Sequence, residues 1–254
     1  MNRQAEALIA AGRRLCRCLA IWKAGPPVAY VYNPLEYAGN AYGLYLERFA
    51  GPGRRVLLLG MNPGPWGMAQ TGVPFGDVHA VRSWLGIERA ITRPAVQHPR
   101  RPVLGFASSR GEVSGQRLWG LMAERFSTAK RFFRQHFVGN YCPLLFLDAE
   151  GRNITPDRLR SGDRETLFRC CDEHLRTTIE TLDPEWLIGI GRFAEKRLRS
   201  VQAEYSLRER AIAQILHPSP ASPAANRGWA RQASAQMISL GIWKPSTAPE
   251  VAKP

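Results

Sequence analysis

Five short apolar runs, separated by stretches with helical periodicity, constrain the fold of this chain more than any other feature. The runs are Val28–Val31, Val56–Leu59, Phe137–Val138 leading into Tyr141–Leu144, Trp186–Ile190 and Ala211–Leu216. Runs this short that are apolar on both faces are typical of strands buried in a parallel sheet. Helical patterns lie at Ser114–Phe126, Arg164–Leu182, Arg192–Ala203 and Pro223–Leu240. The alternation predicts an α/β fold, a three-layer α/β/α sandwich with a central, mostly parallel sheet.

The length of 254 residues is typical of one large domain, and we expect residues 1–244 to form it. An amphipathic helix within residues 1–25 is expected to come first, because arginines interrupt the apolar stretch Ala5–Trp22. Residues 245–254 contain Pro, Ala and Ser and are expected to be a disordered tail. No apolar run approaches the roughly 20 residues that cross a bilayer, so no membrane partner is expected. We expect a monomer.

The charge balance points to a polyanionic partner. Thirty-five basic and 21 acidic side chains give a net charge of +14, and such an excess most often serves nucleic acid, with an anionic membrane surface second. The stretch Arg89–Arg110 contains five arginines and no acid, and three prolines interrupt it. It predicts an extended basic loop, for which an ordinary solvated connection is the alternative.

The cysteines number five, at positions 16, 18, 142, 170 and 171, and no two have C-x-x-C spacing. We interpret them as reduced thiols of an intracellular protein rather than a disulfide framework, with an iron–sulfur cluster as the sharper alternative. The chain is therefore expected to be cytoplasmic, and nucleoid-associated in a bacterial cell.

The loop after the second apolar run is unusually rich in glycine and proline. It reads Gly-Met-Asn-Pro-Gly-Pro-Trp-Gly-Met over Gly60–Met68 and continues to Gly76. Glycine allows a ligand to approach the backbone closely, and proline restricts the path of the chain. Ligands of open α/β sheets bind beyond the carboxyl ends of the strands, so this loop is a candidate site, with a surface turn as the plain alternative.

The loop after the fifth apolar run is the second candidate. It begins with His217 and continues Pro-Ser-Pro-Ala-Ser-Pro-Ala-Ala-Asn to Asn226. Ser222 followed by Pro223 is the pattern of an N-cap and a first-turn proline, so we expect the helix Pro223–Leu240 to start there. The amides at such a helix start favour an anion near His217. A lone histidine is more often structural, but this one directly follows a strand.

At these residues the sequence resembles the uracil-DNA glycosylases of the single-strand-selective monofunctional type. Gly60–Met68 and His217–Asn226 are similar to the two signature motifs of that family, and the resemblance covers most of residues 30–243. It implies hydrolysis of the N-glycosidic bond of uracil in single- and double-stranded DNA, leaving an abasic site. Asn62 would hold the attacking water, and His217 would donate a hydrogen bond to uracil O2 as charge develops there.

The resemblance also implies a base-reading set. Asn140 matches the asparagine that donates to uracil O4 and accepts from N3–H, a pattern that cytosine reverses. Phe75 matches the aromatic residue on which the flipped base stacks. Met61 and Gly64 would approach the base with backbone atoms. Because Gly64 has no side chain near the 5-position, 5-substituted uracils such as 5-hydroxymethyluracil are implied substrates.

A wedge that fills the emptied base stack is implied in the second loop. Its residues are Pro218, Ser219, Pro220, Ala221, Ser222, Asn226 and Arg227. Family members carry a basic residue at the position of Ala221, which weakens the expected insertion here, and Arg227 could replace part of the contact. No lysine lies in or beside the two loops to form a Schiff base, so the expected enzyme is monofunctional. No metal or other cofactor is expected, because the five histidines show no ligand spacing.

Three alternatives stay open on the sequence. The first is a related glycosylase that prefers another deaminated base, such as a purine. The second is a non-catalytic protein that binds damaged or single-stranded DNA, which explains the arginines but not the paired loops. The third is a nucleotide-dependent enzyme, suggested only by the G-x-G at Gly189–Gly191, which lacks the third glycine of a dinucleotide fingerprint.

Overall fold

A computed structural model describes residues 2–245, so the tail expected at 245–254 lies, apart from Pro245, outside the described residues. Its main sheet has four parallel strands in the order β3-β2-β6-β7. These are β2 (Val56–Gly60), β3 (His136–Asn140), β6 (Trp186–Ile190) and β7 (Ala211–Ile215). All five residues of β2 are buried, as a central strand covered on both faces requires. The predicted α/β fold with a parallel sheet is confirmed.

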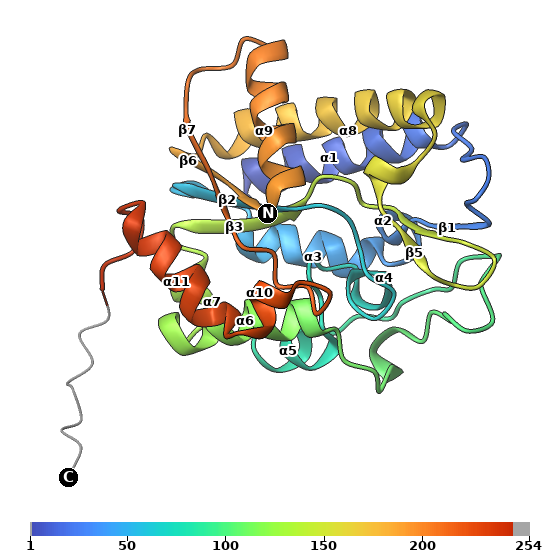
Figure 1. Cartoon of the computed structure of the whole chain (residues 1–254), viewed down its shortest axis with the longest axis horizontal. Helices are drawn as coiled ribbons and strands as arrows, with labels where there is room; N and C mark the ends of the chain where they lie inside the picture. The colour runs from blue at the N-terminus through green and yellow to red at the C-terminus, as the bar shows by residue number, and fades with distance from the viewer. Residues whose placement is uncertain (1, 246–254) are drawn as a thin grey trace.

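Helices cover both faces of this sheet (Figure 1). The helices α8 (Ser161–Leu182) and α9 (Arg192–Glu204) lie on one side, and α5 (Val78–Ser83), α6 (Val113–Phe126) and α11 (Trp229–Ser239) lie on the other. The expected first helix is α1 (Arg3–Leu19), whose apolar stripe packs against α8 and α3 (Gly39–Phe49). The remaining short elements are α2 (Pro34–Tyr37), α4 (Met68–Thr71), α7 (Ala129–Phe132), α10 (Pro223–Asn226) and two 3₁₀ turns, Gly105–Ala107 and Pro156–Arg158. None of the helices in residues 2–245 is both long and apolar enough to span a membrane.

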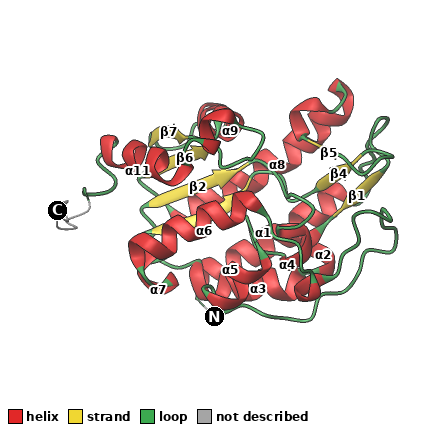
Figure 2. Cartoon of the chain, turned by 60° about the horizontal axis from the view of Figure 1, so that its bottom comes forward, coloured by secondary structure: helices red, strands yellow, loops and turns green. Residues whose placement is uncertain are grey.

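The first apolar run was expected in the parallel sheet, and that prediction is wrong. Its residues lead into β1 (Tyr30–Tyr32), which pairs antiparallel with β4 (Leu145–Leu147) in a separate sheet completed by β5 (Asn153–Ile154). Figure 2 shows this small sheet beside the main one. Apolar character alone does not select a pairing partner, and Pro34, which starts a helix two residues after the strand, limits β1 to three residues.

Two further predictions about individual elements are also wrong. The strand β7 is partly exposed rather than buried on both faces, because it is the edge strand of the sheet and has one neighbour. The single helix expected over Pro223–Leu240 is two helices, α10 and α11. They are separated at Gly228, whose φ of 93° lies in the left-handed region that ends a helix. The helix start beside His217 is therefore a single short turn and not a built anion site.

The expectation that all five cysteines are reduced is wrong for two of them. Cys18 and Cys170 form a disulfide, with their Cα atoms 6.0 Å apart, and the described structure leaves Cys16, Cys142 and Cys171 free. The bond joins α1 to α8, which pack side by side although the two cysteines are 152 residues apart in sequence. Only that packing brings the two thiols within bonding distance.

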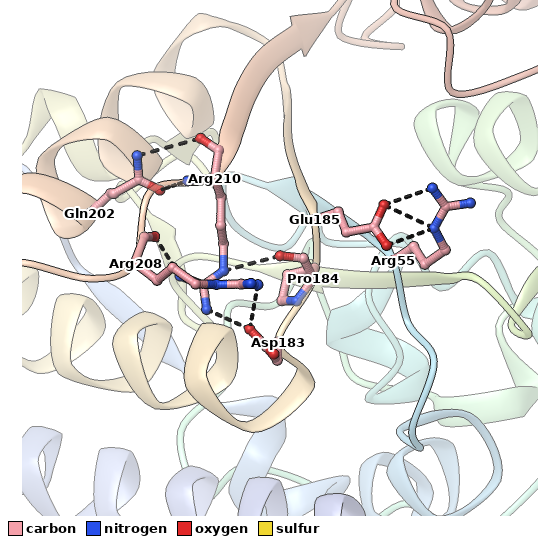
Figure 3. Close-up of polar contacts among 7 residues, drawn as sticks. All are labelled: Arg55, Asp183, Pro184, Glu185, Gln202, Arg208 and Arg210. Atoms are coloured by element: carbon pink, nitrogen blue, oxygen red, sulfur yellow. Dashed lines mark hydrogen bonds and ion pairs between the residues drawn. The ribbon is translucent and has the colours of Figure 1, made fainter.

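Ion pairs join the amino ends of the parallel strands (Figure 3). Arg55, just before β2, donates to Glu185, just before β6, with a closest distance of 2.7 Å. Asp183 accepts from both Arg208 and Arg210, each at 2.8 Å, and Arg210 directly precedes β7. Much of the charge at this edge is thus paired. The loops that begin at the opposite, carboxyl edge are the ones that carry the candidate site.

Candidate functional site

A cavity of about 390 Å³ lies at the carboxyl edge of the main sheet. Loops that follow β2 and β7 form it, together with the last residue of β3, the start of α6, and residues in and next to β5. A larger hollow, about 770 Å³, lies between α1 and α3 and contains none of the predicted site residues. The smaller cavity is the candidate site because it collects most of them. It is lined by Met61, Asn62, Pro63, Gly64, Pro65, Met68, Phe75, Glu112, Ser114, Asn140, Asn153, Thr155, His217, Ser219 and Pro220.

At the floor of the cavity, the glycine that ends β2 allows the side chains of Asn140 and Phe75 to lie directly against the strand. A methyl group at Gly60 would lie 2.5 Å from Asn140 Oδ1 and 2.6 Å from Phe75 Cε2, so any larger residue would displace both side chains. Phe75 has a φ of 53°, which is unusual outside glycine. Two bonds to its carbonyl oxygen hold it there, from Trp119 Nε1 at 3.0 Å and from the Asp77 amide at 2.8 Å.

The two predicted amide side chains occupy neighbouring walls. Asn62 Nδ2 donates to the carbonyl oxygens of Leu144 at 3.2 Å and Pro63 at 3.4 Å. With its amino group so engaged, the residues described here give Asn62 Oδ1 no hydrogen-bond donor, and this oxygen is the free end of a side chain that lines the cavity. Asn140, the last residue of β3, is oriented by a contact from its Nδ2 to Met68 Sδ at 3.3 Å.

The geometry of His217 defines which ring nitrogen carries the proton. The backbone amide of Ser219 donates to His217 Nδ1 at 3.1 Å, so Nδ1 is an acceptor and Nε2 holds the hydrogen. Burial lowers the pKa of His217 to about 4, so the ring is neutral at physiological pH. Its centroid lies 6.3 Å from that of Phe75. The cavity therefore presents a neutral N–H donor beside an aromatic ring.

Glu112 is a cavity residue that sequence reasoning missed. It is the N-cap of α6, where its Oε2 accepts from the Gly115 amide at 3.2 Å. Its carboxyl group lies against the glycine loop: a methyl at Gly64 would be 3.3 Å from Oε1, and one at Gly67 would be 2.7 Å from Oε2. Burial, with a smaller contribution from the nearby Asp77 carboxylate, raises the pKa of Glu112 to about 7. The only signal in the sequence is an acid directly before a helix.

Ser114, Asn153 and Thr155 also line the cavity and were not predicted. They come from the start of α6 and from the small antiparallel sheet. Neither element was linked to the two signature loops by sequence order. No pattern of spacing could have found them.

The predicted wedge residues form one continuous loop, of which only part faces the cavity. Ser219 and Pro220 line it, whereas Pro218 is buried behind them. The loop residues beyond them, Ala221 and Arg227 included, are mostly exposed, and Ser222 caps α10 through its hydroxyl at 3.3 Å from the Ala225 amide. The Asn226 side chain bonds within the loop, donating from Nδ2 to the Pro220 carbonyl at 2.9 Å.

The predicted basic loop, Arg89–Arg110, has no strand and only one 3₁₀ turn, and it runs beside the glycine loop. Trp66 joins the two, because the guanidinium groups of Arg110 and Arg101 lie 4.7 and 5.6 Å from its ring centroid. Such cation–π contacts hold arginines without neutralising them. Across residues 2–245, none of the ion pairs involves an arginine of this loop.

Comparison with known proteins gives a consistent family. The model of the uracil DNA glycosylase superfamily matches residues 48–238. The chain is 45% identical over 216 residues to the single-strand selective monofunctional uracil-DNA glycosylase of Rattus norvegicus, covering 85% of this chain and 77% of that protein. The Bos taurus protein of the same name is 46% identical over 215 residues, which are 85% of this chain and 79% of that protein.

A solved structure is similar in fold. The crystal structure of wild-type SMUG2 from Pedobacter heparinus matches with a TM-score of 0.66 at 19% identity, covering 96% of this chain and 100% of that one. At this identity the likeness concerns the fold alone. It agrees with the layered α/β arrangement described above.

Proposed function

Because this chain belongs to the uracil DNA glycosylase superfamily, with 44–46% identity to single-strand selective members, we propose that it is a monofunctional uracil-DNA glycosylase. The enzyme hydrolyses the N-glycosidic bond of uracil in DNA and leaves an abasic site. The observation that carries the proposal is one cavity in which a neutral histidine N–H donor, two amides and an aromatic ring meet. We also propose that residues 1–244 act as one domain, since one hydrophobic core contains residues from Ala5 to Trp243.

In this proposal His217 and Asn62 perform the hydrolysis. As the bond breaks, negative charge develops on the departing uracil, and His217 Nε2–H donates to its O2. The neutral ring suffices because a hydrogen bond to the anion is stronger than one to the neutral base. Asn62 Oδ1 accepts a hydrogen bond from a water and aims it at the sugar carbon. An amide is not basic enough to remove the proton, so orientation is its contribution.

Base selection falls to a second set of residues. Phe75 stacks on the flipped base, a contact worth about 1–3 kcal/mol. Asn140 pairs with O4 and N3–H of uracil and leaves cytosine mismatched. Met61 and Gly64 present backbone atoms to the base, and 5-substituted uracils such as 5-hydroxymethyluracil are proposed as further substrates.

In this proposal, arginines and the second signature loop hold DNA at the cavity by contacts that do not depend on the base sequence. The loop Pro218–Arg227 enters the base stack, and the arginines of Arg89–Arg110 contact phosphates on either side. Arg227, an exposed residue at the end of this loop, adds a further cation. Binding is therefore expected to weaken steeply with salt, for single and double strands alike.

An oligonucleotide assay tests the function directly. Single- and double-stranded DNA with one uracil is incubated with the protein and then treated with alkali. Cleavage only after alkali is expected, since a monofunctional enzyme leaves the strand intact. Arms with 5-hydroxymethyluracil and with a deaminated purine define the lesion range. Faster release of the purine, or binding of uracil DNA without any release, would refute the proposal.

Replacing Asn140 by aspartate tests base reading. The carboxylate cannot donate to uracil O4 and repels it instead, so kcat/KM for uracil DNA is expected to fall by at least about tenfold. Steady-state excision from single-stranded DNA measures the change. Asn40→Asp, an exposed residue of α3, is the matched control. Unchanged uracil kinetics in Asn140→Asp would exclude the assigned role.

The raised pKa of Glu112 predicts a pH effect on excision. Its carboxyl group is neutral below its pKa of about 7 and negative above it. The negative form opposes the charge that develops on departing uracil, so the single-turnover rate is expected to fall several-fold as pH rises through about 7. Glu112→Gln is expected to remove this decrease and keep the rate flat. If both proteins share one profile between about pH 5.5 and 8.5, Glu112 does not act on the reaction.

A further inference from the structure

One arginine outside both signature loops forms hydrogen bonds with the loop that carries His217. Arg117 lies in the second turn of α6, on the helix layer rather than at a strand end. Its Nη1 donates to the carbonyl oxygens of Pro218 at 3.0 Å and Ser219 at 3.4 Å, and its Nη2 donates to Asn226 Oδ1 at 2.9 Å. One guanidinium group thus ties the beginning of the loop to its end.

These bonds fall at the points that define the histidine. The peptide between Pro218 and Ser219 contributes its carbonyl to Arg117, while the amide of the same peptide donates to His217 Nδ1 at 3.1 Å. Fixing this peptide plane therefore fixes which nitrogen of the imidazole is protonated and where Nε2 points. At the far end of the loop, Asn226, which accepts from Arg117, also donates from its Nδ2 to the Pro220 carbonyl at 2.9 Å.

The Arg117 guanidinium group binds the loop without an acidic partner. Throughout the described chain, Arg117 takes part in no ion pair, and its described partners are two backbone carbonyls and one amide oxygen. Three acceptors at different angles match a planar group with several N–H donors. A lysine has the same charge, but a single ammonium nitrogen on a flexible stem cannot span both ends of the loop.

We infer that Arg117 is a positioning residue for excision: it holds the His217–Asn226 loop in the shape that presents His217 Nε2 to uracil and the loop tip to DNA. This inference rests on the proposed function, because Arg117 affects excision only through the position of His217. It does not depend on a contact between Arg117 and the substrate. Geometry, rather than charge, is the property that matters.

The test compares Arg117→Lys and Arg117→Gln with wild type, using Arg134→Gln, an exposed arginine beyond α7, as the charge-loss control. Both Arg117 variants are expected to lose about 10- to 100-fold in single-turnover excision, since misplacing a reacting group by about 1 Å has effects of this size. The control is expected to match wild type. Asn226→Ala removes one of the three acceptors of Arg117 together with the bond from Asn226 Nδ2 to the Pro220 carbonyl, and it is expected to fall in between. Full activity in Arg117→Lys would show that charge suffices and would overturn the inference.

A spectroscopic readout separates this inference from the proposed function. Ring ¹⁵N shifts of His217 in the folded protein report its tautomer without any substrate. Wild type is expected to show the Nε2–H form alone, and both Arg117 variants a mixture of the two tautomers, with unchanged thermal unfolding temperatures. A single unchanged tautomer in both variants would contradict the positioning role even if the enzyme is active. If the ¹⁵N shifts of His217 change in the Arg117 variants but the wild-type protein releases no uracil, the proposed function is refuted and the positioning role is not.

Discussion

Replacing His217 by alanine is expected to lower the single-turnover rate of uracil excision by about 100- to 1,000-fold, the usual effect of removing a donor aimed at developing negative charge. The ring donates through Nε2, since its Nδ1 accepts from the Ser219 amide. Within the described residues, His217 is the only histidine that lines the cavity, and its ring centroid lies 6.3 Å from that of Phe75. Rapid-quench measurement on single-stranded uracil DNA reports the chemical step without product release.

The control for this variant is His79→Ala, since His79 is exposed and lies outside the cavity. Both proteins should bind uracil DNA with similar affinity, because the lost interaction forms in the transition state and not in the ground state. A His217→Ala protein that keeps more than about a tenth of the wild-type rate would exclude a dominant role for this hydrogen bond.

Replacing Asn62 by alanine is expected to have a comparable effect, a loss of at least about 100-fold in the same single-turnover assay. The side chain is held at its amino end by the Leu144 carbonyl, and in the proposed mechanism its Oδ1 orients a water. Alanine removes that acceptor and leaves the water without a fixed direction of attack. The expected defect lies in the rate and not in the affinity for DNA.

Aspartate at position 62 distinguishes orientation from proton removal. Asn62→Asp keeps an acceptor oxygen and adds a base, but it loses the amino group that donates to the Leu144 carbonyl, so it is expected to recover only part of the activity that alanine loses. Asn40→Ala serves as the control for loss of an amide at an exposed site. Near-normal excision by Asn62→Ala would contradict the water-positioning role and leave His217 as the main catalytic group.

Much of the main sheet could be predicted because its strands are local patterns. The runs Val56–Leu59 and Trp186–Ile190 are continuous apolar segments, and each became a buried strand of the parallel sheet. Because such runs are continuous, the sequence also shows at which residue each strand ends. The meeting of the loops after β2 and β7 followed from that rule, and the structure places Asn62 and His217 on one cavity.

The errors arose where a local pattern has more than one tertiary outcome. The run Val28–Val31 has the same apolar character as the central strands, yet the chain pairs it in a second sheet. Ala211–Ile215 is apolar but lies at the edge, where only one neighbour covers it. The cysteines at 18 and 170 carry no spacing signal, since their bond depends on how α1 packs against α8.

By itself, the sequence determined the layered α/β class, the two signature loops, and the types of side chain to which the proposed hydrolysis and base reading are assigned. These are properties of short segments, where spacing and residue type act through local backbone geometry. Only the tertiary structure decided the protonated nitrogen of His217, the raised pKa of Glu112 and the grip of Arg117 on the loop. Each depends on burial or on a hydrogen bond between segments distant in sequence, such as Arg117 and Asn226, which are 109 positions apart. Such contacts exist only after the helices have packed on the sheet.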